Sequence, residues 1–110
     1  MTFDFYQQQA RRTQNHDLMK ADKEHHALHG MASEVGEVHS IYQKVYQGHE
    51  MNYNKVIDEA GDLLWFLSEL ADCIGTTLDH IAQHNIDKLR RRYPEGFDAD
   101  RSLHRSGDTA

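Results

Sequence analysis

The sequence predicts an all-α fold: a helical bundle of four to five helices whose core is completed by oligomerisation. The 110 residues contain one proline and seven glycines, so few positions interrupt a helix. No segment alternates apolar and polar residues over the length of a strand, whereas apolar residues recur at intervals of three and four along most of the chain. We therefore expect a single domain over residues 1–110, with a polar C-terminal tail over about residues 94–110.

Four helices are expected in order, over about residues 2–13, 22–47, 52–74 and 77–93. The second should end at Gly48 and the third at Gly75, because glycine readily adopts the left-handed conformation that closes a helix. The fourth should end before Pro94, and either Thr76 or Thr77 can cap its start.

The third helix carries apolar residues on more than one face, most densely over residues 63–67. A chain of this length buries roughly two thirds of the surface that its unfolded form exposes, which leaves helical faces for a partner. We expect a homodimer or a homotetramer.

Twelve Lys and Arg residues against eighteen Asp and Glu residues give a net charge of −6. This acidity argues against a nucleic-acid polymer or an anionic membrane as the partner. The one cysteine, Cys73, excludes an intramolecular disulfide and a multi-cysteine metal site. Without an apolar stretch long enough to span a membrane or a basic, apolar leader, the sequence predicts a soluble, cytoplasmic protein.

Two acidic pairs carry the candidate chemistry: Glu34 with Glu37, and Glu59 with Asp62. Each pair is spaced i, i+3, which on a helix separates two side chains by about 4.5 Å of rise and about 60° of rotation. Both carboxylates of a pair can therefore reach one cation. Hard oxygen ligands in this number suit Mg²⁺ or Mn²⁺.

A glycine interrupts each acidic pair, Gly36 in the first and Gly61 in the second. Glycine inside a helix costs about 1 kcal/mol relative to alanine, so we expect the two helices to approach closely there and bring the four carboxylates together. A di-iron bundle would need Glu-x-x-His steps on two helices, and no glutamate in the sequence precedes a histidine by three residues.

The acidic pairs and their flanks resemble the MazG-like, all-α nucleoside triphosphate pyrophosphohydrolases, in the short form of phage and bacterial members. The similar segments are residues 6–7, 10–13, 30–38, 59–67, 85–97 and 101–105. The resemblance implies Mg²⁺-dependent hydrolysis of (deoxy)nucleoside triphosphates to the monophosphate and pyrophosphate. Glu34, Glu37, Glu59 and Asp62 would hold Mg²⁺, for which Mn²⁺ can substitute, and metal-activated water would attack the α phosphate.

The resemblance further implies that Asn85, Lys88 and Arg92 face the phosphates, although basic residues near a helix C-terminus also complement its dipole. Lys44 follows Glu37 by seven residues and is either another phosphate ligand or a surface lysine.

Trp65 follows Asp62 by three residues, so it either stacks on a base in the same site or packs in a subunit interface. Gln7, Arg11 and Thr13 are further candidates for contact with the base or substrate. Two other functions stay open: a non-catalytic helical oligomer acting as a protein-interaction module, and, among enzymes, a phosphoribosyl-ATP pyrophosphohydrolase.

Overall fold

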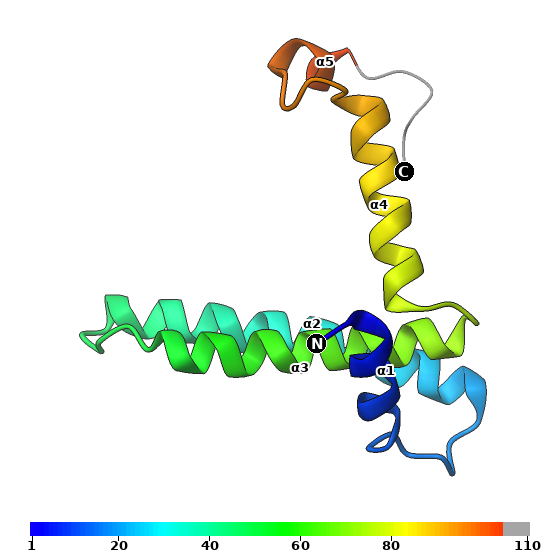
Figure 1. The fold of residues 1–110 in the computed structure, drawn as a ribbon. Coiled ribbons are helices and arrows are strands. Elements are labelled where there is room, and N and C mark those ends of the chain that lie inside the picture. The colour runs from blue at the N-terminus through cyan, green and yellow to red at the C-terminus, as the bar shows by residue number, and fades with distance from the viewer. Residues whose placement is uncertain (105–110) are drawn as a thin grey trace. The chain divides into compact units, whose positions relative to one another are not determined.

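The computed structural model describes residues 1–104, and its regular elements are five helices (Figure 1). They are α1 (Phe3–Arg11), α2 (Lys20–Tyr46), α3 (Tyr53–Cys73), α4 (Leu78–Arg92) and α5 (Ala99–Leu103). The all-α prediction is confirmed, and the four expected helices have the predicted bounds to within two residues. The chain divides into two compact units, Met1–Leu78 and Asp79–Ala110.

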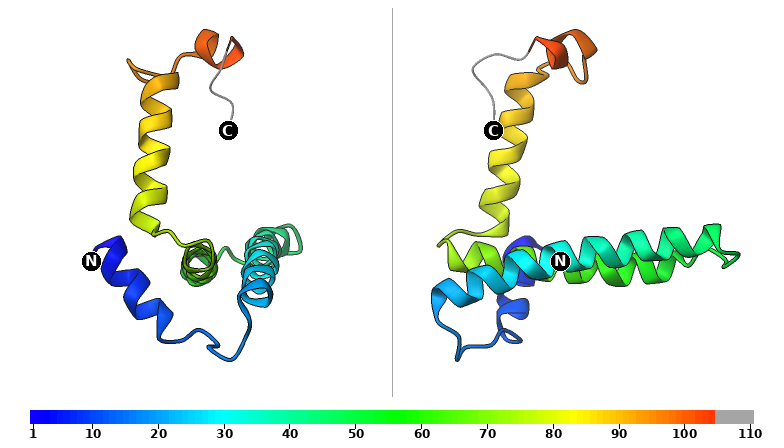
Figure 2. Two further views of the ribbon diagram at one scale, coloured as in Figure 1. Left: turned by 90° about the vertical axis from the view of Figure 1, so that its right-hand side faces the viewer. Right: turned by 180° about the vertical axis from the view of Figure 1, so that it is seen from behind.

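In the first unit, α2 and α3 form a long antiparallel pair, and α3 lies between α1 and α2 (Figure 2). Small side chains let the helices pack, since Ala27 of α2 and Ala71 of α3 are fully buried. Close approach occurs at Gly30 of α2, where the ring of Phe66 occupies the place that a Cβ atom would need. At Gly36 and Gly61 a Cβ atom would meet nothing within 4 Å. The prediction that those two glycines admit a neighbouring helix is therefore wrong for this unit.

Glycines end α2 and α3 as the sequence predicts. Gly48 has φ of 96° and Gly75 has φ of 76°, in the left-handed region that residues with a side chain avoid. Beyond Gly75, the Thr76 N–H donates to the Ala71 carbonyl at 2.9 Å, which satisfies a carbonyl left free at the end of α3. The same bond pattern follows Gly48 at the end of α2.

A single carboxylate, Asp72 of α3, fastens the N-terminal segment to the rest of the unit. Arg11 Nη2 donates to Asp72 Oδ1 at 2.7 Å, Gln7 Nε2 donates to the same oxygen at 2.8 Å, and Gln14 Nε2 donates to Oδ2 at 2.7 Å. The Gln7 Oε1 atom also accepts from the Leu78 N–H at 2.8 Å, at the first turn of α4. Directional hydrogen bonds, including charge-assisted ones to the Asp72 carboxylate, therefore hold α1 against the end of α3.

In the second unit, α5 lies in the segment that the sequence predicts to be a polar tail. The Asp98 side chain caps α5 by accepting from the Asp100 and Arg101 N–H groups. Arg101 Nε donates to the Arg92 carbonyl at 2.8 Å, near the end of α4, where helix carbonyls lack partners. The predicted polar tail thus contains a short helix over Ala99–Leu103, and residues 105–110 of that segment lie outside the described part of the chain.

Several large apolar side chains of α2 and α3 remain exposed. On α2, Val35, Tyr42 and Val45 are 43%, 45% and 39% exposed, and Ile57 of α3 is 67% exposed. The contacts within the chain therefore leave these faces partly uncovered. Over residues 1–104, the helices lack the combination of length and apolar composition that a membrane crossing requires.

We predict that Asp72→Asn lowers the free energy of unfolding by about 2 kcal/mol, because an amide in place of the carboxylate loses charge-assisted bonds to Arg11 and its glutamine partners. Urea unfolding followed by circular dichroism measures this loss. Although burial acts to raise it, bonds from Arg11, Gln7 and Gln14 hold the pKa of Asp72 below its ordinary value. The stabilisation should therefore be present above about pH 4 and be lost as the pH falls below it.

Glu50→Gln, in the exposed connection between α2 and α3, provides the matched control and should leave the urea midpoint unchanged. An Asp72→Asn midpoint equal to that of the wild type would show that the contacts of Asp72 do not stabilise the unit.

Candidate functional site

Three carboxyl groups converge between α2 and α3. One oxygen each from Glu34, Glu59 and Asp62 lies within 4.8 Å of the other two. The antiparallel register brings them together, because the middle of α2 lies opposite the first half of α3. Glu34 and Glu59 are half-buried and Asp62 is exposed. We call these three residues the acid cluster.

The acid cluster is electrostatically strained when no cation is bound. A hydrogen bond with Glu59, burial, and the negative charges of Glu59, Asp62 and Glu37 raise the pKa of Glu34 to about 7. The second carboxyl oxygen of Glu34, Oε2, is buried and has no hydrogen-bond partner within the described chain. Protonation of Glu34 relieves part of the repulsion, and a divalent cation would relieve it more fully.

The fourth predicted acid, Glu37, is not among the three side chains that converge. It is exposed on α2, one turn after Glu34, and its charge contributes to the raised pKa of Glu34. Glu37 is therefore near enough to influence the acid cluster electrostatically, and its role toward a metal ion or a water molecule stays a prediction.

Tyr6 of α1 is influenced by the charge of the acid cluster. Burial and the charge of Asp62 raise the pKa of the Tyr6 hydroxyl, which places α1 within the electrostatic reach of the cluster. Tyr6 was not among the predicted site residues, although residues 6–7 form one of the segments that resemble the family.

The predicted substrate contacts Gln7 and Arg11 have partners inside the fold. Gln7 is buried and both ends of its amide are occupied, by Asp72 and by backbone groups at Thr76 and Leu78. Arg11 forms its ion pair with Asp72. The structure thus gives both side chains a role in docking α1, and their contact with substrate stays a prediction.

Trp65 and Thr13, two other predicted substrate residues, lie together. The Trp65 indole N–H donates to Thr13 Oγ1 at 2.8 Å. The indole also stands edge-on to the Phe66 ring, with centroids 5.1 Å apart, so it is fixed on two sides.

A buried carboxylate next to these aromatic side chains escaped the sequence analysis. Glu69 is 1% exposed, and its Oε1 atom lies 2.7 Å from Nδ1 of His26 on α2. The available signal was its position: Glu69 is the one charged residue within the apolar run from Leu63 to Ala71. A charged residue in such a run usually has a buried partner.

The predicted phosphate ligands fall in both units. Lys44 is exposed in the last turn of α2. Asn85, Lys88 and Arg92 follow one side of α4, which belongs to the second unit except for its first residue. Their spacing of three and four residues is kept in a continuous helix, and their contact with phosphates stays a prediction.

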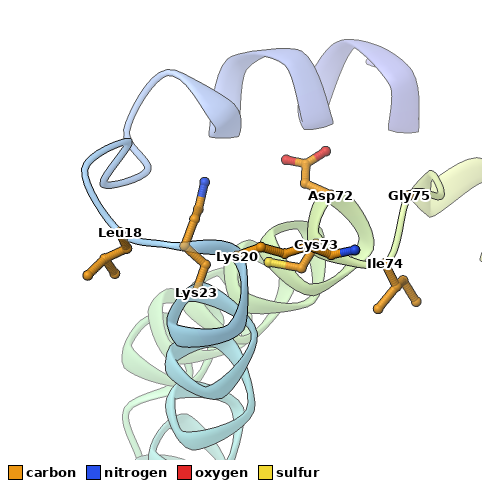
Figure 3. Close-up of a pocket in the computed structure, with 7 residues that line it drawn as sticks. All are labelled: Leu18, Lys20, Lys23, Asp72, Cys73, Ile74 and Gly75. Carbon is orange, nitrogen blue, oxygen red and sulfur yellow. The ribbon is translucent and has the colours of Figure 1, made fainter.

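A pocket of about 430 Å³ lies where α2 begins and α3 ends (Figure 3), and none of its lining residues belongs to the acid cluster. Its lining residues are Leu18, Lys20, Lys23, Asp72, Cys73, Ile74 and Gly75. Burial raises the pKa of the Cys73 thiol, so the reactive thiolate is disfavoured there. Asp72 is already occupied by α1, and we therefore place the candidate site at the acid cluster.

Comparison with known proteins places the chain in a family. The model of the MazG nucleotide pyrophosphohydrolase domain matches residues 22–97, a range that includes the acid cluster and Glu37 and crosses from the first unit into the second. A relative named Gene 37 protein, from Mycobacterium phage L5, is 26% identical over 72 residues. The aligned region covers 61% of this chain and 63% of that protein, so the chain spans less than two thirds of its curated relative. No solved structure matches the chain. Since the family model covers more than half of the sequence, the chain belongs to the MazG nucleotide pyrophosphohydrolase domain family.

Proposed function

We propose that the protein hydrolyses (deoxy)nucleoside triphosphates between the α and β phosphates, giving the nucleoside monophosphate and pyrophosphate. The observation that carries this proposal is the convergence of Glu34, Glu59 and Asp62 on adjacent helices of a chain from the MazG family. An acidic protein needs a cation to bind so strongly anionic a substrate, and the acid cluster has the chemistry to hold one.

The acid cluster fits a hard divalent cation such as Mg²⁺, with Mn²⁺ as a substitute. Its donors are carboxylate oxygens, which both ions prefer. The buried and unpartnered Oε2 atom of Glu34 is a further reason to expect a positive ligand. When bound, the cation supplies charge neutralisation for the triphosphate and activates water for attack on the α phosphorus.

The side chains of the protein would bind the cation, orient the attacking water and contact the phosphates and the base. Glu34, Glu59 and Asp62 would provide negative charge at fixed positions, and Glu37 would provide a fourth carboxylate for the metal or orient the attacking water. Phosphate contacts would come from residues that the family resemblance or their spacing selects: Lys44, Asn85, Lys88 and Arg92. Trp65 would stack on the base.

We further propose that a second copy of the chain covers the exposed apolar faces of α2 and α3. The support is the exposure of Tyr42, Val45 and Ile57 in helices whose fully buried apolar side chains, Ala27 and Ala71, are small. Exposed apolar area of this kind is typical of an interface in a homo-oligomer.

The central test is the hydrolysis of a panel of nucleoside triphosphates in the presence of Mg²⁺. We predict that Asp62→Asn and Glu37→Gln each lower turnover by about 100-fold or more, because each replacement removes a charge while preserving shape. Monophosphate and pyrophosphate are measured as products, and circular dichroism should show helicity equal to that of the wild type. Near wild-type turnover by both variants would refute the proposed metal site.

A pH prediction follows from Glu34. Its folded-state pKa of about 7 lies above the ordinary 4.5, so the folded protein binds this proton more tightly than the unfolded chain does. In metal-free protein the stability gained from this proton is fully present below about pH 4.5 and is lost as the pH rises through about 7. Mg²⁺ takes the place of the proton, so we expect it to raise the melting temperature more at about pH 8 than at about pH 6.

Thermal unfolding with Mg²⁺ or with a chelator measures this difference. Glu34→Gln should abolish most of the stabilisation by Mg²⁺, whereas Glu50→Gln should retain it. Equal stabilisation of the wild type and Glu34→Gln at both pH values would contradict a role for Glu34 in binding the cation.

Light scattering coupled to size-exclusion chromatography tests the oligomer. We expect a mass that is a multiple of 12.8 kDa for the wild type and a shift toward the monomer for the double variant Tyr42→Ser/Val45→Ser, which removes apolar area from α2. Leu103→Ser, at an exposed apolar position on α5, is the control. A wild-type mass of 12.8 kDa over a wide range of concentrations would rule out the oligomer.

A further inference from the structure

A histidine on α2 is held in one orientation by a buried carboxylate. His26 Nδ1 lies 2.7 Å from Oε1 of Glu69, and Glu69 is 1% exposed. The His26 side chain itself is 49% exposed. The ring is therefore anchored through Nδ1, and about half of the side chain is exposed to solvent.

The chemistry of the pair determines which nitrogen is available. The contact with Glu69 Oε1 engages Nδ1 of the His26 ring, and a proton placed on Nδ1 makes Nε2 a hydrogen-bond acceptor. The second ring nitrogen, Nε2, has no hydrogen-bond partner among the described residues and remains for a ligand. A carboxylate that fixes the orientation of an imidazole in this way prepares it for a defined contact.

Two aromatic side chains lie against the imidazole of His26. The His26 ring meets Phe66 at a centroid distance of 5.5 Å and Trp65 at 6.5 Å, in both cases edge to face. Trp65 is in turn fixed by its hydrogen bond to Thr13. A rigid aromatic surface beside an oriented hydrogen-bonding group suits a planar, polar ligand such as a nucleoside.

The position along the helices relates this surface to the acid cluster. His26 precedes Glu34 on α2 by eight residues, which is about 12 Å of helix rise. Trp65 follows Asp62 on α3 by about one turn, so it lies between the two. A separation of this size matches a nucleoside attached to a phosphate group at the acid cluster.

We propose that His26, positioned by Glu69, hydrogen-bonds the nucleoside portion of a substrate whose phosphates bind at the acid cluster. This inference rests on the proposed function and extends it, since it assigns the nucleoside end to the side of the α2–α3 pair that carries His26 and Trp65. His26 is a substrate-binding residue in this assignment, and Glu69 is a positioning residue.

The test compares two ligands that share the phosphates and differ in the nucleoside. One is an α,β-methylene nucleoside triphosphate, which cannot be cleaved at the proposed bond, and the other is inorganic tripolyphosphate; both are titrated with Mg²⁺ by calorimetry. His26→Gln should weaken binding of the nucleotide analogue about tenfold, the loss expected for one hydrogen bond in a site. Its affinity for tripolyphosphate should stay within about twofold.

His25→Gln is the matched control, because His25 is the neighbouring exposed histidine and points about 100° away around the helix. It should bind both ligands as the wild type does. Glu69→Gln should show the same selective loss as His26→Gln, which a purely structural role would not produce. If the buried substitution prevents folding, the exposed His26 variant still decides the question.

The outcomes separate this inference from the proposed function. Wild-type binding of both ligands combined with unchanged nucleotide affinity in His26→Gln would overturn the inference alone. An equal loss for both ligands would overturn it too, since His26 would then act on the phosphates or on folding. A wild-type protein that binds neither ligand would overturn the proposed function and this inference together.

Discussion

Repulsion among the three carboxyls of the acid cluster is the constraint around which the first unit is organised. Glu34, Glu59 and Asp62 hold oxygens within 4.8 Å of one another, which flexible side chains in water would avoid. Two long helices impose this proximity through contacts made elsewhere along their length, including Phe66 against Gly30 and His26 with Glu69. Packing and hydrogen bonds away from the cluster therefore offset the electrostatic cost within it.

A proton and a cation compete for the same position in this arrangement. Without metal, the pKa of Glu34 reaches about 7, so its carboxyl is partly protonated at neutral pH. A divalent ion must displace that proton, which links metal affinity to pH in the range where cells operate. The carboxyl groups of the acid cluster are therefore already close together when no cation is bound, and Glu34 need not be fully ionised in that state.

Local patterns in the sequence were sufficient to predict the helices, their glycine ends and the two acidic pairs. Each of these depends on spacing within one helix or on the backbone freedom of one residue, such as Gly75. Which carboxyls converge depends instead on the register between α2 and α3, and this is why Glu37 lies outside the cluster although it obeys the same i, i+3 spacing as Asp62. The prediction allowed a fifth helix, but the position of α5 was not predicted because its five residues are too few for a periodic pattern, although Asp98 is a good N-cap.

Long-range polar pairs were the other feature that spacing could not reveal. The sequence offers no means of joining Gln7 or Arg11 to Asp72, more than sixty positions away, or His26 to Glu69. Gln7 and Arg11 were predicted to contact substrate because they are polar and lie in or beside segments that resemble the family. In the structure both side chains form hydrogen bonds to Asp72 within the fold. Glu69 could have been selected from the sequence, because a charged residue inside an apolar run usually has a buried partner. The sequence still would not have identified that partner as His26.

The contact between Phe66 and Gly30 lets a glycine, which has no functional group, affect the positions of the carboxyl groups in the acid cluster. A methyl group at position 30 would act as a wedge, because the aromatic ring already fills that space. The methyl group would push α2 and α3 apart at a point one turn from Glu34. The distances between the carboxyl groups of the acid cluster would then increase, and their affinity for a cation would fall. Gly30 should accordingly tolerate substitution poorly, although it belongs neither to the acid cluster nor to the proposed nucleoside contact.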